Sequence, residues 1–189
     1  FGDYYSEQGN DTIDFNNEWG FIRYDYLPEE ALNTVLINLT DEQQTVGGIT
    51  LEAYTARDQF GDTDSFLNIS KGGHFWGSKG NDTIIADRNF YFTAMQGGED
   101  SVIITGDVPL GTLEAGYDYD KGVNWSIDDM SFDYIVDEET FTIYVYGNLQ
   151  GLSGSWRDDV LIGNDESNSF KGNGGDDLLQ GLGGDDKFY

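Results

Sequence analysis

The sequence predicts an all-β fold of short strands and tight turns, and three observations favour this class. Glycine-rich nonapeptides follow one another without gaps over residues 154–189. Strand-like runs separated by polar turns fill much of residues 20–60 and 122–147. The one helix-like segment is the short LPEEALN at residues 27–33. We therefore expect strands throughout, with a repeated unit of one turn and one strand at the C-terminal end.

Taken in chain order, each element has its own signal. SEQGNDTID (6–14) is a degenerate turn followed by a strand, and GFIRYDY (20–26), NTVLINLT (33–40) and GGITLEAYT (47–55) are strand-like runs rich in β-branched and aromatic residues. GSKGNDTII (77–85), ADRNFYFTA (86–94) and MQGGEDSVI (95–103) are consecutive nine-residue units, of which the middle one lacks glycine. YIV (134–136) and FTIYVY (141–146) flank DEET, which predicts a hairpin.

The last four units are GSWRDDVLI, GNDESNSFK, GNGGDDLLQ and GLGGDDKFY. Glycine is always first, an acid or its amide is sixth, and a large apolar residue is eighth. Position 6 is Asp159, Asn168, Asp177 or Asp186, and position 8 is Leu161, Phe170, Leu179 or Phe188. Arg157 and Glu166 at position 4, and Asn168 at position 6, depart from the pattern.

Nine residues give one turn and one strand, so eighteen give a full coil with two strands, and residues i and i+18 stack. Because side chains alternate along a strand, position 8 points inward. We expect Asp159 to stack on Asp177, Asn168 on Asp186, and Asp82 on Asp100. Leu161 should lie over Leu179 in one sheet, Phe170 over Phe188 in the other, and Ile84 over Val102.

These turns are suited to a calcium ion. Glycines let the backbone aim several carbonyl oxygens at one point, and the acid at position 6 adds a carboxylate. Flexible cages of hard oxygen ligands favour Ca²⁺ over Mg²⁺, whereas zinc prefers Cys or His, and this chain offers only His74. The candidate metal-binding residues are Asp11, Gly77, Lys79, Gly80, Asp82, Gly97, Asp100, Gly154, Trp156, Asp159, Gly163, Asp165, Asn168, Gly172, Gly174, Asp177, Gly181, Gly183 and Asp186.

The charge of the chain points the same way. Its 36 acids and 9 bases give a formal charge of −27, which divalent cations would neutralise. Nucleic acid and anionic membrane are poor partners because the sequence has no basic patch. It has no cysteine and no apolar run long enough to span a membrane. The alternative interpretation of the acids, a solvated surface suited to a saline habitat, stays open on composition alone.

The tandem units resemble the GGxGxDxUx signature of the RTX family, the repeats-in-toxin proteins. Residues 154–189 and GSKGNDTII carry the resemblance, and DTDSFLNISKGGHFWGSKGNDTII (62–85) is similar to the approach to a repeat block in such proteins. The resemblance implies a parallel β-roll, similar to a right-handed β-helix, with several Ca²⁺ ions in its turns. We expect an inserted antiparallel segment within it. The expected divisions are N-terminal coils (1–106), a strand-rich insertion or calcium-free coils (107–153) and four strict repeats (154–189).

The resemblance also implies type I secretion, folding outside the cell in calcium, and a place within a larger exoprotein. Three functions remain open: a calcium-dependent folding and secretion scaffold, a polysaccharide- or surface-binding adhesion module such as the repeat module of an alginate epimerase, and an enzyme. The scaffold is favoured, and the enzyme is the least favoured, because HExxH and GxSxG are absent and a lone His74 beside aromatics is typical of a packed loop residue. Four tryptophans and twelve tyrosines keep the second open.

Overall fold

The computed structural model describes residues 4–5, 8–24, 34–93, 97–105, 111–116 and 119–189, and every regular element within these ranges is a β-strand. The expected all-β class is therefore confirmed. The helix-like LPEEALN at 27–33 lies outside the described residues. The described part of the chain also has no helix that could cross a membrane.

The first large sheet has eight parallel strands in the order β1-β3-β9-β11-β13-β17-β19-β21. Their bounds are Tyr4–Tyr5 (β1), Gly20–Arg23 (β3), Gly73–Trp76 (β9), Phe90–Thr93 (β11), Gly111–Glu114 (β13), Leu149–Ser153 (β17), Ser169–Lys171 (β19) and Lys187–Phe188 (β21).

The second large sheet has the order β15-β16-β12-β10-β4-β7-β8-β2. Its strands are Ser131–Val136 (β15), Glu139–Tyr146 (β16), Asp100–Ile104 (β12), Thr83–Ala86 (β10), Leu36–Asn38 (β4), Thr55–Arg57 (β7), Thr63–Leu67 (β8) and Thr12–Asp14 (β2). β7 runs antiparallel to both β4 and β8, and β15 runs antiparallel to β16. The other neighbours in this sheet are parallel.

Two smaller sheets complete the described structure. Asn124–Ser126 (β14), Val160–Ile162 (β18) and Leu178–Gln180 (β20) form a parallel sheet of three strands. Gln44–Val46 (β5) and Ile49–Leu51 (β6) form a hairpin whose turn contains Gly47 and Gly48. Both glycines have positive φ, a conformation that L-residues rarely adopt.

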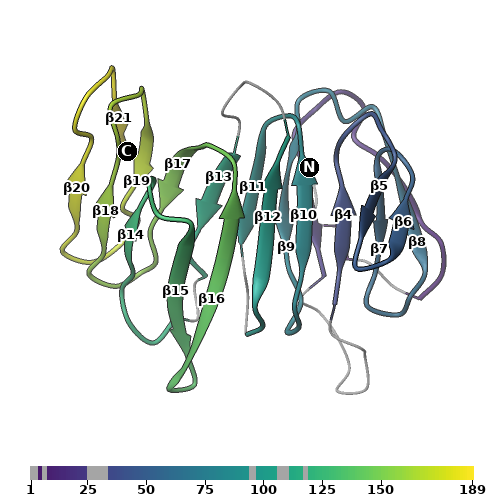
Figure 1. Cartoon of the computed structure of the whole chain (residues 1–189), viewed down its shortest axis with the longest axis horizontal. Helices are drawn as coiled ribbons and strands as arrows, with labels where there is room; N and C mark the ends of the chain where they lie inside the picture. Colours follow the sequence, from purple (N-terminus) through teal and green to yellow (C-terminus); the bar gives the residue numbers. More distant parts are fainter. Residues whose placement is uncertain (1–3, 6–7, 25–33, 94–96, 106–110, 117–118) are drawn as a thin grey trace.

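From β9 to β13, and again from β17 to β21, successive strands alternate between the first sheet and the sheets opposite it, so the chain coils (Figure 1). The coils follow one another along the long axis of the molecule, and the four strict repeats form its C-terminal end. β18 pairs with β20, and β19 with β21, at an offset of eighteen residues. The expected pairs Leu161–Leu179, Phe170–Phe188 and Ile84–Val102 are all in register.

One row of inward-facing side chains from each sheet forms the core. Phe75, Phe92, Leu113, Leu152 and Phe170 are fully buried at matching positions of the first sheet. They join a single apolar cluster with the opposing row, which is Ile37, Ile84, Val102 and Val145. Phe188 in the last strand stacks on Phe170 with ring centroids 5.5 Å apart, although half of Phe188 is exposed.

The predicted hairpin at 134–146 is present as β15 and β16, joined by Asp137 and Glu138, both of which have positive φ. β16 also pairs in parallel with β12, so the hairpin extends the second sheet. Because the chain detours through this hairpin, β14 and β18 pair at an offset of 36 residues instead of eighteen.

Candidate metal centre

Acidic side chains lie at the interfaces between stacked turns, as expected. The backbone N–H of each position-6 residue donates to Oδ1 of the position-6 residue one coil later. This bond is 2.9 Å from Asp82 to Asp100, 3.0 Å from Asp159 to Asp177, and 2.9 Å from Asn168 to Asp186. Each carboxylate is thereby held against the turn of the neighbouring coil.

Two further hydrogen bonds accompany this one in every stack. The position-5 N–H of the later turn donates to the position-5 side chain of the earlier turn, and the position-7 N–H donates to the position-6 carbonyl. For Asp82 and Asp100 these donors are Glu99 N–H, to Asn81 Oδ1 at 3.0 Å, and Ser101 N–H, to the carbonyl of Asp82 at 2.8 Å. The two C-terminal stacks repeat both bonds.

The position-6 side chain also folds back over its own turn. Ser78 and Ser155 each donate a backbone N–H and a hydroxyl to the carboxylate four residues later. A Cβ at the position-1 glycine would overlap that side chain in all five strict turns, at Gly77, Gly154, Gly163, Gly172 and Gly181. Glycine recurs at position 1 because the carboxylate or amide occupies the space of a side chain.

Position 4 follows a different rule. A Cβ at Gly98, Gly175 or Gly184 would clash with the backbone carbonyl of the residue eighteen positions earlier, which is Gly80, Arg157 or Glu166. Arg157 and Glu166 themselves occupy position 4 in the first turn on each edge of the C-terminal block 154–189. These two departures are therefore compatible with the repeat, and carbonyl oxygens lie between the stacked turns beside the carboxylates.

The carboxylates of Asp82 and Asp100 are 2% and 0% exposed. Burial raises the pKa of Asp82 to about 7. Burial, and secondly the charge of Asp82, raise the pKa of Asp100 well above its usual range. Burial also raises the pKa of Asp159. Placing two carboxylates together in a buried site is unfavourable unless a cation or protons compensate their charge.

The donor set fits a calcium ion. Oδ2 of Asp100 is buried without a hydrogen-bond partner, so it is available to a cation. The described residues contain no group of three or more acidic, histidine or cysteine side chains close enough to hold a metal by themselves. A cation here would therefore combine two carboxylates with the carbonyl oxygens of the stacked turns, and an all-oxygen cage suits Ca²⁺.

The structure brings the remaining predicted residues to the same turns. Lys79 lies at position 3 beside Gly97, and Trp156 contacts Gly174 in the next coil. Asp165 is exposed at position 3 and lies against Gly183. The side chain of Trp156 is 57% exposed, so only its backbone is suited to the role predicted for this position.

Sequence reasoning missed Asp64, the partner of Asp11. Asp11 N–H donates to Oδ1 of Asp64 at 3.1 Å, and both accompanying bonds are present, from Thr63 N–H to Asn10 Oδ1 and from Ser65 N–H to the carbonyl of Asp11. Asp64 is fully buried. The sequence does contain a signal for Asp64, since Gly61, Asp64 and Phe66 occupy positions 3, 6 and 8 of a nonapeptide.

His74 lies in a buried network outside these turns. Its Nε2 is 2.9 Å from Oε2 of Glu114 and 2.8 Å from Oγ1 of Thr93, and its ring stacks on Trp76 at 3.7 Å. Although burial raises it, hydrogen bonds from His74 and Thr93 lower the pKa of Glu114 overall. These contacts link three neighbouring strands, β9, β11 and β13.

The coils, each made of turns and strands, stack with acidic side chains between the turns. This arrangement defines a class of β-repeat protein whose turns are suited to a hard cation. A family model agrees, because the RTX calcium-binding nonapeptide repeat matches four copies, at residues 74–89 and 153–188. The predicted resemblance is thus confirmed, and these segments are RTX repeats. The turn residues 97–100 and the Asp11–Asp64 pair lie outside the matched residues. No curated protein matches the chain.

Proposed function

We propose that the chain is a calcium-loaded parallel β-roll module that folds when Ca²⁺ binds and serves as a structural scaffold in a larger exported protein. The stacked carboxylates carry this proposal, above all buried Asp82 and Asp100 with the unpartnered Oδ2. Without a cation these groups oppose folding, and with one they join neighbouring coils. Metal binding and folding are then a single event.

The proposed ligands follow the position rule. Carboxylates come from position 6, and carbonyl oxygens come from the turn positions 1, 3 and 4 of adjacent coils. Three stacks are proposed as sites: 77–82 with 97–100, 154–159 with 172–177, and 163–168 with 181–186. Asp11 and Asp64 form a fourth candidate, in which Asp62 replaces the position-4 glycine.

Export and folding outside the cell rest on the same chemistry. A chain of charge −27 repels itself where free calcium is scarce and loses that repulsion where calcium is abundant. An unfolded chain suits passage through a type I secretion channel, and calcium outside the cell then drives folding. The RTX repeats at 74–89 and 153–188 support this assignment.

Calcium titration tests the proposal. We expect far-UV circular dichroism to show β structure gained on adding Ca²⁺ and lost with EDTA, and calorimetry to show heat from several sites. Mg²⁺ should do little, because it requires a tighter octahedral cage. A chain that is fully folded in EDTA and releases no heat with calcium would contradict the proposal.

A matched pair of variants tests the ligand assignment. Asp177→Ala should remove a carboxylate from the second stack and leave Asp159 N–H without its partner, which costs about 1–3 kcal/mol before any loss of calcium binding. Asp176→Ala changes the exposed neighbouring acid and should be nearly neutral. The measurement is the melting temperature in calcium, and equal melting temperatures for the two variants would refute the assignment.

A further inference from the structure

The outer face of the first sheet is hollowed across its C-terminal strands. Tyr91, Thr112, Gly151, Ser169 and Lys187 form one register row across β11, β13, β17, β19 and β21. The row faces outward, because the alternating residues Phe92, Leu113, Leu152 and Phe170 are in the core. Small side chains in the middle of the row and large ones at its ends leave a groove.

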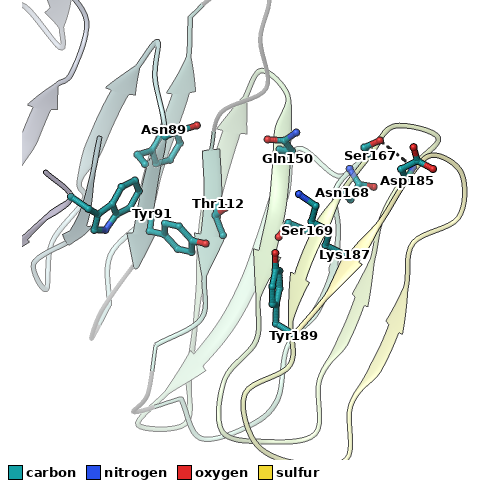
Figure 2. A pocket seen from close by; sticks show the side chains of 12 residues that line it. Asn89, Tyr91, Thr112, Gln150, Ser167, Asn168, Ser169, Asp185, Lys187 and Tyr189 are labelled. Atoms are coloured by element: carbon teal, nitrogen blue, oxygen red, sulfur yellow. Dashed lines mark hydrogen bonds between the residues drawn. The ribbon is translucent and has the colours of Figure 1, made fainter. Parts of the chain in front are cut away.

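Two adjoining hollows make up this groove, with volumes of about 290 Å³ and 250 Å³. They share Tyr91, Thr112, Ser169 and Tyr189, so they are continuous across the strands. Figure 2 shows Tyr91 on one side and Tyr189 with Ser169 on the other, with Thr112 between them. Trp19 packs edge-on against Tyr91, with ring centroids 5.6 Å apart, and extends the aromatic side.

The lining offers two kinds of contact at once. Aromatic rings at both sides present apolar faces, and hydroxyl and amide groups from Thr112, Ser169, Asn89 and Gln150 also line the hollow and offer hydrogen bonds (Figure 2). Neighbouring strands are about 4.8 Å apart, so these groups recur at a regular spacing along the groove. A ligand that matches must repeat, with apolar faces and many hydroxyls, as a sugar chain does.

The charge of the groove and of the whole chain distinguishes a neutral ligand from an anionic one. The groove is nearly balanced, since Lys171 and Lys187 line it and Asp185 is the one acid among the described lining residues. Lys187 forms no ion pair with the rest of the described chain, so its ammonium is free to donate hydrogen bonds. The remainder of the molecule is strongly negative and would repel a polyanion, which argues against nucleic acid and acidic polysaccharides.

A peptide strand fits less well than a sugar chain. Peptides that join a sheet do so at an exposed edge, where backbone groups are unpaired. This groove crosses the face of the sheet, and its strands β13, β17 and β19 each pair on both sides. We therefore propose that the outer face between Tyr91 and Tyr189 binds a neutral polysaccharide, a function beyond the calcium-dependent scaffold.

Affinity electrophoresis in calcium tests the proposal, using soluble β-glucan, xylan and galactomannan as neutral probes and alginate and pectate as acidic ones. The wild-type chain should be retarded by at least one neutral polymer. Tyr91→Ala should weaken that binding more than tenfold. Tyr189→Ala should also weaken it, and because this side chain is 74% exposed its removal leaves the fold unchanged. Tyr146→Ala is the matched control, an exposed tyrosine on β16 of the other large sheet.

Circular dichroism in calcium must show that each variant is folded, which separates loss of the groove from loss of the scaffold. Binding to none of the neutral polymers would overturn the proposal, as would a preference for the acidic ones. Wild-type affinity in both Tyr91→Ala and Tyr189→Ala would overturn it equally.

Discussion

Glycine has two separate roles in these turns, set by what lies against each Cα. At position 1 the obstacle is the carboxylate or amide of the same turn, and this holds in all five strict turns. At position 4 the obstacle is a backbone carbonyl of the preceding coil, so the glycine is needed only where that carbonyl is present. Gly175 illustrates the second case, because it combines positive φ with close contact to the carbonyl of Arg157.

Gly175→Ala should therefore cost more than Gly9→Ala, although the two glycines share nearly the same φ, 114° and 115°. A Cβ at Gly9 meets nothing within 4 Å, so that variant isolates the backbone strain of about 1–2 kcal/mol. Gly175→Ala adds a clash with rigid backbone, which is typically worth a further ~1–3 kcal/mol. The check is thermal unfolding in calcium, where the extra cost lowers Tm by roughly 2–4 °C per kcal/mol. Equal melting temperatures would show that the coils are not in contact at this point.

Individual residues also show where sequence reasoning reached its limit. The pairs Asp159–Asp177 and Asn168–Asp186 could be predicted, because strict nine-residue spacing fixes a coil of eighteen residues. The tolerance of Arg157 at position 4 could not, because it depends on which coil lies beneath that turn. The pairing of Asp11 with Asp64 was also missed, since their separation of 53 residues is not a multiple of nine.

At the scale of elements, the β15–β16 hairpin closes one side of the Asp82–Asp100 stack. Tyr134 of β15 donates its hydroxyl to the carbonyl of Gly97 at 3.0 Å, and its ring stacks on Tyr119 with centroids 4.6 Å apart. Both tyrosines are buried, and Phe141 of β16 lies against Gly97. The hairpin thus covers the turn that carries the buried Asp100.

Tyr134→Phe should lower stability and calcium affinity at this stack together. The change leaves the carbonyl of Gly97 without its donor, which costs about 1–3 kcal/mol in a buried site. Tyr144→Phe, on the same hairpin but partly exposed, is the control and should stay within about 0.5 kcal/mol of wild type. Calcium release after mixing with a chelator gives the second measurement. A single, unaltered release phase in Tyr134→Phe would show that the hairpin does not influence the site.

The hairpin could be predicted from its sequence, whereas its place in the sheet could not. Alternating residues around a four-residue turn indicate two antiparallel strands. The parallel pairing of β16 with β12 places Ser101 opposite Tyr144. These two residues are not separated by a multiple of the nine-residue repeat, so the repeat does not predict the pairing. The arrangement of the N-terminal strands could not be predicted either. β7 lies antiparallel between β4 and β8, and no local sequence pattern indicates this pairing.

At the scale of the whole molecule, the apolar core favours folding and the net negative charge opposes it. Each coil contributes a narrow row of apolar side chains, and the charge of −27 works against compaction. Bound calcium would neutralise the carboxylates, and so would protonation. The calcium-free chain should therefore respond to pH through its buried carboxylates.

In EDTA, where most of the chain is unfolded, the folded fraction should rise as the pH falls from about 7 toward 4. The folded-state pKa of Asp82 is raised to about 7 and that of Asp100 is also raised, so between these values and the ordinary carboxyl range the folded state binds more protons than the unfolded state. Stability therefore decreases as pH rises through this window, and the penalty is complete above it. In excess calcium the dependence should reverse, because protons then compete with the ion for the same oxygens.

Asp82→Asn provides the control for this prediction, since the amide keeps the shape but neither titrates nor repels Asp100. The amide loses one of the two backbone hydrogen bonds that the carboxylate accepts, from Val35 N–H and Ser78 N–H, so the pH dependence is the informative measurement. In EDTA the folded fraction of the variant, followed by circular dichroism, should change less between pH 5 and pH 8 than that of wild type. In calcium its melting temperature should be below that of wild type, because the amide is the weaker ligand. A wild-type chain whose stability in EDTA is the same at pH 5 and pH 8 would mean that these carboxylates are not buried together, and would contradict the calcium assignment at this stack as well.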